Sequence, residues 1–232
     1  MLMSLINFIK RELEGWGKYE RIIFPAVILF IFVTSVCVGD NPVAIVSAVC
    51  GISYTILAGK GKISCYYIGL CGTMCYAYLS LASGLWGNLA LYAFYYFPMQ
   101  ILGIFRWQKH LRTDKQEIVK TQLSNKDRFR YAFVTVLASA LLAYILKITG
   151  DSSPVIDGIT TAFSVTGLLL TVKRCIEQWH VWLVVNGLSA LMWLNLVLHG
   201  SKTLATFMMW TVYFFLAIYF LVAWKRDLAK KF

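Results

Sequence analysis

The sequence has 232 residues, of which 59% are hydrophobic and only 14% are charged. Soluble domains are on average about half apolar and about a quarter charged, so these proportions exclude an ordinary soluble domain. The net charge of +11 resembles that of nucleic-acid-binding proteins, but the cations lie between apolar runs and at the chain ends, which argues against a nucleic-acid partner. We therefore expect a protein embedded in a lipid bilayer.

Eight apolar runs, with Asp157 as their single charged residue, are long enough to form membrane helices. They cover residues 22–38, 43–58, 64–82, 86–105, 131–146, 155–172, 179–198 and 203–224. In lipid, helices and closed barrels satisfy every backbone polar group, and barrel strands would alternate over about ten residues. The sequence therefore predicts an all-α integral membrane protein with eight transmembrane helices.

Residues 1–21 precede the first run and predict an amphipathic helix at the cytoplasmic membrane surface rather than a signal peptide. Leu2, Leu5 and Ile9 share one helical face, whereas Lys10 and Arg11 lie outside it. A helix that binds a protein partner is the alternative interpretation.

The cations also predict the orientation in the membrane. In an eight-helix arrangement all but two of the 22 Lys and Arg residues fall on one side, and the exceptions are Lys147 and Lys202. Because Lys and Arg are enriched in cytoplasmic loops, both termini and the long loop after the fourth run are expected in the cytoplasm.

The chain also repeats part of itself. Tyr96 and Trp107 recur as Tyr213 and Trp224 at a constant separation of 117 residues. This favours two parallel three-helix repeats joined by a linker helix, with an extra N-terminal helix, and a substrate site between the repeats near the bilayer midplane. Chance similarity between apolar helices is the alternative. The predicted segments are an amphipathic stretch (1–21), the extra helix (22–40), the first repeat (41–107), a cytoplasmic loop with the linker helix (108–150), the second repeat (151–225) and a cytoplasmic tail (226–232).

The seventh run carries polar and aromatic side chains at intervals of three and four residues. These are Trp179, Trp182, Asn186, Ser189 and Trp193. Such spacing places them on one face of a helix. A polar group at membrane depth is costly unless it faces a partner, a cavity or a ligand. We interpret this face as one wall of a binding site, with hydrogen bonding between helices as the alternative.

A second wall is predicted in the fourth run, and its members are Tyr92, Tyr96, Gln100 and Trp107, with Tyr213 as the repeat partner of Tyr96. At the repeat offset Gln100 corresponds to Ala217, and Asn186 lies opposite Cys71 or Gly72. Each half thus holds an amide that the other lacks, which suits an asymmetric ligand.

Pro98 lies in the middle of the fourth run, close to Gln100. Because proline has no N–H to donate, the helix is expected to kink there. The kink could be a hinge for alternating access or a static packing feature.

The stretches WGNLALYAFYYFPMQILGIFRWQKH (86–110) and QWHVWLVVNGLSALMW (178–193) resemble the bacterial nicotinamide riboside transporters of the PnuC family. The resemblance implies a fold similar to that of the SWEET transporters, uptake of nicotinamide riboside across the inner membrane for NAD synthesis, and a homotrimer. A carrier of thiamine, riboflavin or a sugar with the same fold remains an alternative, and a polytopic membrane enzyme is less favoured.

The residue chemistry agrees with such a substrate. Trp and Tyr rings can stack on a cationic pyridinium, and Gln100 and Asn186 can both donate and accept hydrogen bonds. No Asp or Glu lies deep in any run, so facilitated diffusion is favoured over proton coupling. The six cysteines include no C-x-x-C pair, and no clustered histidines or carboxylates suggest catalysis. We expect no metal, no cofactor and no catalytic residue.

Overall fold

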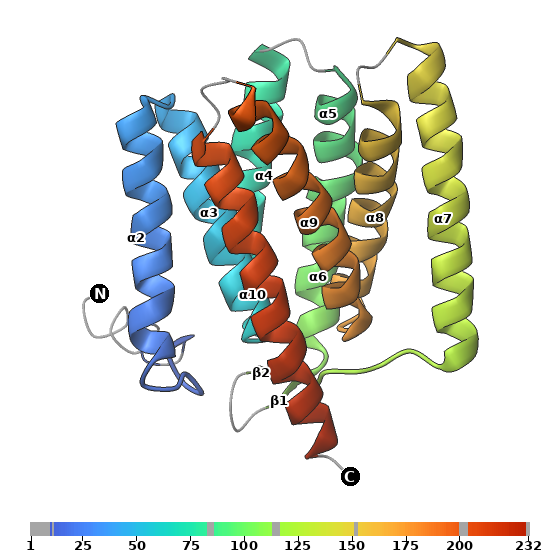
Figure 1. The fold of residues 1–232 in the computed structure, drawn as a ribbon. Helices are drawn as coiled ribbons and strands as arrows, with labels where there is room; N and C mark the ends of the chain where they lie inside the picture. Colours follow the sequence, from blue (N-terminus) through green and yellow to red (C-terminus); the bar gives the residue numbers. More distant parts are fainter. Residues whose placement is uncertain are drawn as a thin grey trace. The chain divides into compact units, whose positions relative to one another are not determined.

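The protein is described by a computed structural model that covers residues 10, 12–82, 86–112, 117–150, 153–199 and 204–230. Its regular structure is almost entirely helical (Figure 1). The helices are α2 (Glu20–Val38), α3 (Pro42–Gly59), α4 (Ser64–Ala82), α5 (Trp86–Leu91), the π-helical turn η1 (Tyr92–Tyr96), α6 (Phe97–Gln108), α7 (Asn125–Ile148), α8 (Pro154–Val172), α9 (Glu177–Leu198) and α10 (Leu204–Ala229). Two short antiparallel strands, β1 (Leu111–Arg112) and β2 (Glu117–Ile118), lie between α6 and α7.

Each of the eight predicted runs coincides with a helical segment when α5, η1 and α6 are counted as one. The all-helical prediction is therefore confirmed. The amphipathic helix predicted over residues 1–21 lies partly outside the described chain, at residues 1–9 and 11. Residues 13–19 are described and form turns and irregular structure, so the prediction of a helix is wrong for this part of the segment.

Six helices of the described part are long and apolar enough to cross a membrane, namely α2, α3, α7, α8, α9 and residues Thr206–Ala229 of α10. Helix α4 matches α2 in length, with 19 residues each, but it is rich in Ser, Cys, Thr and Tyr. On α7, Phe133, Leu137 and Leu141 are about 60% exposed, as expected for side chains that contact lipid rather than water. The chain is therefore a multi-pass membrane protein.

Local sequence signals explain where several helices begin and end. Asn41 caps α3 by accepting a 2.8 Å hydrogen bond from Val43 N–H, and Pro42 occupies the first helical position. Ser124 caps α7 in the same way through Asp127 N–H. Helix α2 ends at Gly39, whose left-handed φ of 80° is easily adopted by a residue without a side chain.

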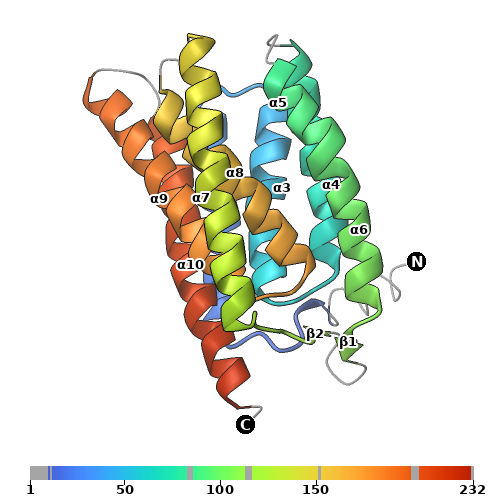
Figure 2. The same cartoon turned by 90° about the vertical axis from the view of Figure 1, so that its right-hand side faces the viewer.

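The chain divides into two compact units, residues 1–119 and 120–232, and the boundary falls inside the segment predicted as loop and linker helix. In the first unit α2 packs on α3, α3 on α4, and α4 on the α5–η1–α6 segment. Figure 2 shows α4 between α3 and α6. In the second unit α7 packs on α8, α8 on α9, and α9 on α10. In both units, consecutive helices therefore pack on one another along the chain.

Cationic loops gather at one end of the first unit. Lys60 donates to Gly15 O at 2.9 Å and forms a 3.0 Å ion pair with Glu20. In the same region Ile118 N–H donates to Gly61 O at 3.0 Å, so β2 is tied to the loop between α3 and α4.

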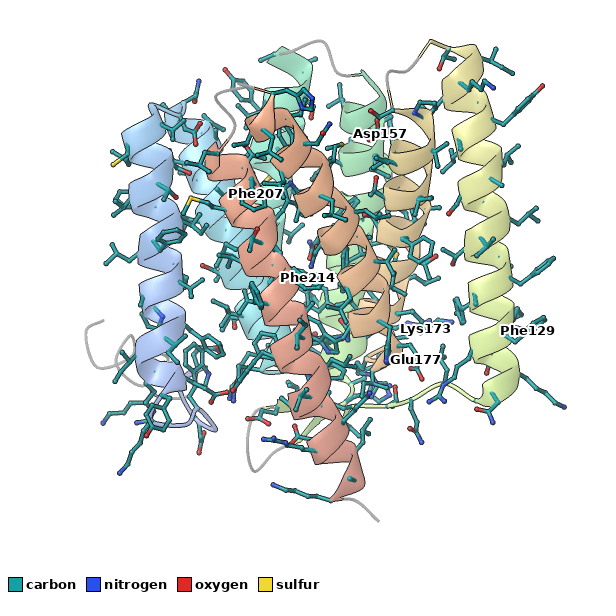
Figure 3. The ribbon with its side chains drawn as sticks, in the orientation of Figure 1. Phe129, Asp157, Lys173, Glu177, Phe207 and Phe214 are labelled. Atoms are coloured by element: carbon teal, nitrogen blue, oxygen red, sulfur yellow. The ribbon has the colours of Figure 1, made fainter. Side chains whose placement is uncertain are left out.

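The second unit has a comparable end. Lys120 pairs with Asp227, Arg128 pairs with Glu177 at 2.8 Å, and Thr121 N–H donates to Arg174 O at 2.9 Å. Figure 3 shows Glu177 at this end of the unit.

Candidate substrate site

The helix that contains Pro98 is interrupted immediately before it. Tyr92 to Tyr96 form a π-helical turn, and Phe97 N–H donates to the carbonyl of Tyr92, five residues earlier. A proline cannot donate to the carbonyl one turn before it, and a π turn accommodates the missing bond by inserting one extra residue. The α-helix is therefore interrupted by a π turn just before Pro98, where the sequence predicts a kink.

The π turn aligns a stack of three tyrosine rings. Tyr92 and Tyr96 are stacked with centroids 4.7 Å apart and planes 9° from parallel. On its other side Tyr92 stacks on Tyr76 of α4, with centroids 4.3 Å apart. This stack offers flat π faces, to which another aromatic ring or a cation is attracted.

Gln100 lies one turn beyond this stack and is only 3% exposed. Within the described residues, its Oε1 has no hydrogen-bond partner. Its carboxamide occupies the space left by Gly69 of α4, where a Cβ atom would lie 2.7 Å from both Nε2 and Oε1. An unpaired buried acceptor costs about 1–3 kcal/mol, so a ligand that donates to Oε1 would recover this energy.

Trp107 is fully buried in the same unit. Its ring makes an edge-to-face contact with Tyr66, with centroids 4.9 Å apart. Tyr66 also covers Gly103, where a Cβ atom would lie 2.1 Å from its ring. Trp107 therefore belongs to the packed interior in this structure.

In the second unit, α9 is helical throughout the predicted stripe, so the five stripe residues share one face. Trp179 is 2% exposed and packs against Phe220 and Trp224 of α10, with centroids 5.2 and 5.7 Å away. Trp182 turns toward α8, where its ring covers Gly167 and its Nε1–H donates to Thr171 Oγ1 at 3.3 Å.

Asn186 and Ser189 follow on the same stripe, between Trp182 and Trp193, and each is 5% exposed. Trp193 and Tyr213 are half-buried, and the Tyr213 ring lies 5.8 Å from that of Trp210. The stripe therefore combines two buried polar side chains with accessible aromatic surface.

The structure adds residues to the candidate site that the sequence did not indicate, and all of them lie in the first unit. Tyr54, Tyr66, Gly69 and Tyr76 surround Gln100, Gly103 and the tyrosine stack. The signal was present, because α4 carries its buried and aromatic residues with the same three-four spacing as α9. These positions are Tyr66, Gly69, Thr73, Tyr76 and Ser80.

One buried cation was also missed. Lys62, in the loop between α3 and α4, is 1% exposed. Burial lowers the pKa of its ammonium group below the usual 10.5, and nearby carboxylates, that of Glu117 first, act in the opposite direction. Lys62 therefore already has anionic neighbours at the end of the helices.

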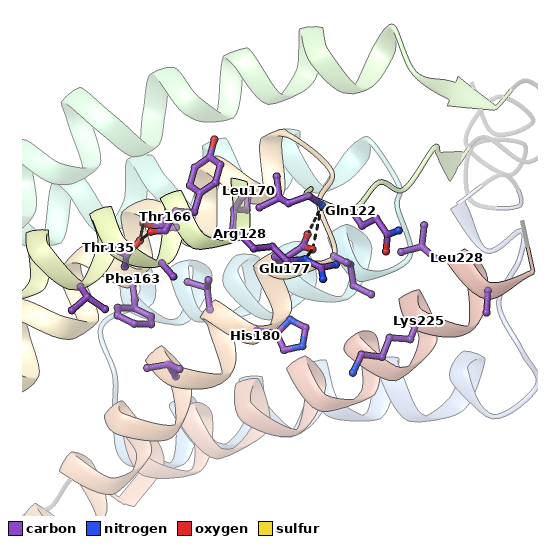
Figure 4. A pocket seen from close by; sticks show the side chains of 18 residues that line it. Gln122, Arg128, Thr135, Phe163, Thr166, Leu170, Glu177, His180, Lys225 and Leu228 are labelled. Carbon is purple, nitrogen blue, oxygen red and sulfur yellow. Dashed lines mark hydrogen bonds and ion pairs between the residues drawn. The ribbon is translucent and has the colours of Figure 1, made fainter. Parts of the chain in front are cut away.

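The second unit also contains a cavity of about 850 Å³ among α7, α8, α9 and α10 (Figure 4). None of the ten predicted site residues lines it. Among the described residues, no three His, Cys, Asp or Glu side chains are grouped so that they could hold a metal ion.

Comparison with known proteins gives consistent matches over most of the chain. A sequence model of the family described as nicotinamide mononucleotide transporter matches residues 41–226. The nicotinamide riboside transporter PnuC of Neisseria mucosa is 30% identical over 234 residues, covering 97% of this chain and 88% of the relative. That of Haemophilus influenzae is 28% identical, covering 97% of both chains. A crystal structure of the vitamin B3 transporter PnuC superposes with a TM-score of 0.79 at 30% identity, over 95% of this chain and 97% of that one.

Proposed function

This chain belongs to the nicotinamide mononucleotide transporter family, and from that premise we propose that it carries nicotinamide riboside across the inner membrane of a bacterium. The family is one of transporters rather than enzymes. Within the structure, the observation that carries the proposal is the buried Oε1 of Gln100, which finds no hydrogen-bond donor among the described residues and lies beside a stack of tyrosine rings. A carboxamide and an aromatic stack together suit a ligand with a flat cationic ring and hydrogen-bonding groups.

The ten predicted residues are proposed to bind the substrate. Gln100, Asn186 and Ser189 would supply hydrogen bonds to ribose hydroxyls or to the substrate carboxamide. The aromatic members would supply ring faces, and they are Tyr92, Tyr96, Trp107, Trp179, Trp182, Trp193 and Tyr213. Trp107 and Trp179, which are almost fully buried, would support the rings in front of them.

The riboside fits this set better than the mononucleotide. A phosphate group is normally bound by Arg or Lys, and none of the ten residues is charged. Lys62 is buried, but its carboxylate neighbours compete with any phosphate. The names of the two relatives above, which specify the riboside, agree with this choice.

We propose further that the chain contains two parallel three-helix repeats, α3–α4–α5/α6 and α8–α9–α10, with α7 as linker and α2 as the extra helix. Support comes from two left-handed residues 113 positions apart, Gly61 with φ 70° and Arg174 with φ 63°. At this offset the spaced residues of α4 align with the α9 stripe, and Asn186 corresponds to Thr73 rather than to Cys71 or Gly72.

Ring packing gives the repeat a second line of support. Tyr66 contacts Trp107 at 4.9 Å, and Trp179 contacts Trp224 at 5.7 Å, both edge-to-face and at equivalent positions. Between the first two helices of each proposed repeat, a ring and a glycine also face each other, but the helices that carry them are exchanged. In α3 a tyrosine ring (Tyr54) covers a glycine of α4 (Gly69), whereas in α9 a tryptophan ring (Trp182) covers a glycine of α8 (Gly167).

Eight helices are proposed to cross the membrane, with both termini in the cytoplasm. The clustering of cations at one end of each unit supports this orientation. We also propose transport by facilitated diffusion with alternating access, and the π turn before Pro98 would be the hinge. The absence of Asp and Glu from the ten proposed binding residues supports facilitated diffusion.

The homotrimer implied by the resemblance is a separate proposal, which the mass of the detergent-solubilised protein would test.

A ligand panel tests the substrate assignment. Purified protein in detergent is titrated with nicotinamide riboside, nicotinamide mononucleotide, thiamine and riboflavin by calorimetry. Binding of the riboside at least tenfold tighter than the other three is expected. Tighter binding of thiamine or riboflavin would contradict the substrate assignment but not the fold. Tighter binding of the mononucleotide would contradict the argument that an uncharged site disfavours a phosphate group.

A further inference from the structure

The cavity of the second unit is a furrow between two helices, α7 and α9, that flank a third. Helices α7 and α9 both pack on α8. The furrow lies over α8, which contributes Phe163, Thr166 and Leu170. Its volume of about 850 Å³ is large enough for a chain-like apolar group.

Along most of its length the furrow is apolar. Its walls include Val136, Phe163, Val181 and Val184. The hydroxyls of Thr135 and Thr166 lie 2.7 Å apart and hydrogen-bond to each other, so they do not require a polar ligand. Val136 and Val184 are 60% and 38% exposed, so the furrow opens onto the lipid-facing surface of the unit.

One end of the furrow is cationic. Arg128 of α7 and Lys225 of α10 line it, and Glu177 of α9 is the carboxylate between them. Glu177 is already engaged, since it accepts from Arg128 Nε at 2.8 Å and from Leu123 N–H at 3.2 Å. No ion pair of Lys225 occurs among the described residues, and Figure 4 shows its side chain extending toward His180.

We propose that this furrow binds an anionic phospholipid, with one acyl chain along α8 and the phosphate at Lys225 and Arg128. An apolar channel open to the membrane with cations at one end matches the shape and charge of such an amphiphile. Basic pockets between membrane helices bind anionic headgroups, and each cation near the surface contributes about a fivefold gain in affinity. The site shares no residue with the proposed substrate site, so the lipid would occupy it with or without substrate.

Lipid binding to the purified, delipidated protein tests the charge. Phosphatidylglycerol and phosphatidylcholine with identical acyl chains are compared by native mass spectrometry and by the shift in Tm. The variant Lys225→Gln leaves the Arg128–Glu177 pair intact, and Arg128→Gln/Lys225→Gln removes both cations. We expect losses of phosphatidylglycerol affinity of about fivefold and about 25-fold, respectively.

A matched control removes the same charge outside the furrow. Arg130 is exposed on α7 and pairs with Asp127 at 3.0 Å, and Lys230 lies beyond α10. The variant Arg130→Gln/Lys230→Gln should keep phosphatidylglycerol affinity within about twofold of the wild type, because neither side chain lines the furrow and charges on the exposed surface are screened by salt.

A second pair of variants tests the apolar part without changing charge. Val184→Trp fills the furrow and should abolish retention of phosphatidylglycerol. Leu137→Trp adds the same ring at an exposed position of α7 that does not line the furrow, and should leave retention unchanged.

Three results would overturn the proposal. Equal shifts with phosphatidylglycerol and phosphatidylcholine would remove the role of charge. An equal shift with sn-glycerol 3-phosphate would indicate a site for free phosphate rather than lipid. Unchanged phosphatidylglycerol binding by Val184→Trp would place the lipid elsewhere. Nicotinamide riboside binding, measured on the same samples, separates this outcome from failure of the transport assignment.

Discussion

The carboxamide of Gln100 is seated against Gly69. A Cβ atom on Gly69 would lie 2.7 Å from both Nε2 and Oε1 of Gln100. A Cβ atom essentially never lies so close to a non-bonded atom, so the lack of a side chain at Gly69 of α4 permits the buried position of the amide on α6. In the part of the chain that the structure describes, no donor reaches its Oε1. Two of the following predictions depend on this contact.

Gly69→Ala should displace the carboxamide and lower nicotinamide riboside affinity about tenfold, with a stability loss of about 1–3 kcal/mol from overpacking. Calorimetric titration and a thermal melt measure the two effects. If Gly69→Ala lowers the affinity only by displacing the Gln100 amide, the double variant Gly69→Ala/Gln100→Ala should bind the riboside no more weakly than Gln100→Ala alone. Additive losses of affinity would show that Gly69 acts through another neighbour, such as Tyr54.

Gln100→Leu should stabilise the ligand-free protein while weakening substrate binding. Replacing an unpaired buried amide with an apolar side chain of similar size removes a penalty of about 1–3 kcal/mol. Tm without substrate is therefore expected to rise, and the substrate-induced shift in Tm to shrink. A variant that melts lower and binds normally would instead identify Gln100 as a hydrogen bond between helices.

Pro98→Ala should restore the missing N–H and favour an uninterrupted α-helix in place of the π turn. The stacking of Tyr92 and Tyr96 would then be lost, and uptake into proteoliposomes should fall at least tenfold. Pro25 is a matched control because it also lies inside a helix that is apolar enough to span the membrane, α2. Pro25→Ala should keep uptake within about twofold of the wild type, and equal losses in both variants would indicate a general effect of proline.

Lys62 should make stability depend on alkaline pH. Burial lowers its pKa in the folded state below the usual 10.5 of the unfolded chain, so between these two values the unfolded state binds more protons. The free energy of unfolding should therefore rise with pH across this window. In melts between pH 8 and pH 10.5, the stability of the wild type relative to Lys62→Met should increase with pH. A constant difference would show that the ammonium is not titrating there.

The helices, and the alignment of the α9 stripe on one helical face, could be predicted from spacing alone, and the reason is local. Eight apolar runs define their own ends, because charged residues or a short Ser-Gly stretch separate them. Intervals of three and four residues place Asn186 with Trp182 on any helix. The prediction needed no knowledge of neighbouring helices.

The remaining features depend on contacts between helices that spacing does not contain. Gly69 is covered by a ring from the preceding helix, α3, whereas Gly167 is covered by a ring from the following helix, α9. The composition of the helices cannot distinguish these two arrangements. Pro98 indicates a distortion, but the stacking of Tyr92 on Tyr76 of α4 is a contact between helices that the spacing does not contain. The furrow exists because α7 and α9 both pack on α8 and leave a gap between them, which is a property of the assembled unit.

The central claim is that this transporter binds nicotinamide riboside through the amides of Gln100 and Asn186. Its most direct test is a calorimetric titration of nicotinamide riboside into the purified wild type, Gln100→Ala and Asn186→Ala. Saturable binding by the wild type is predicted, with affinity about tenfold or more weaker in each variant, as expected when a buried hydrogen bond is lost. Wild-type affinity in both variants would contradict the site, and no binding to the wild-type protein would contradict the substrate.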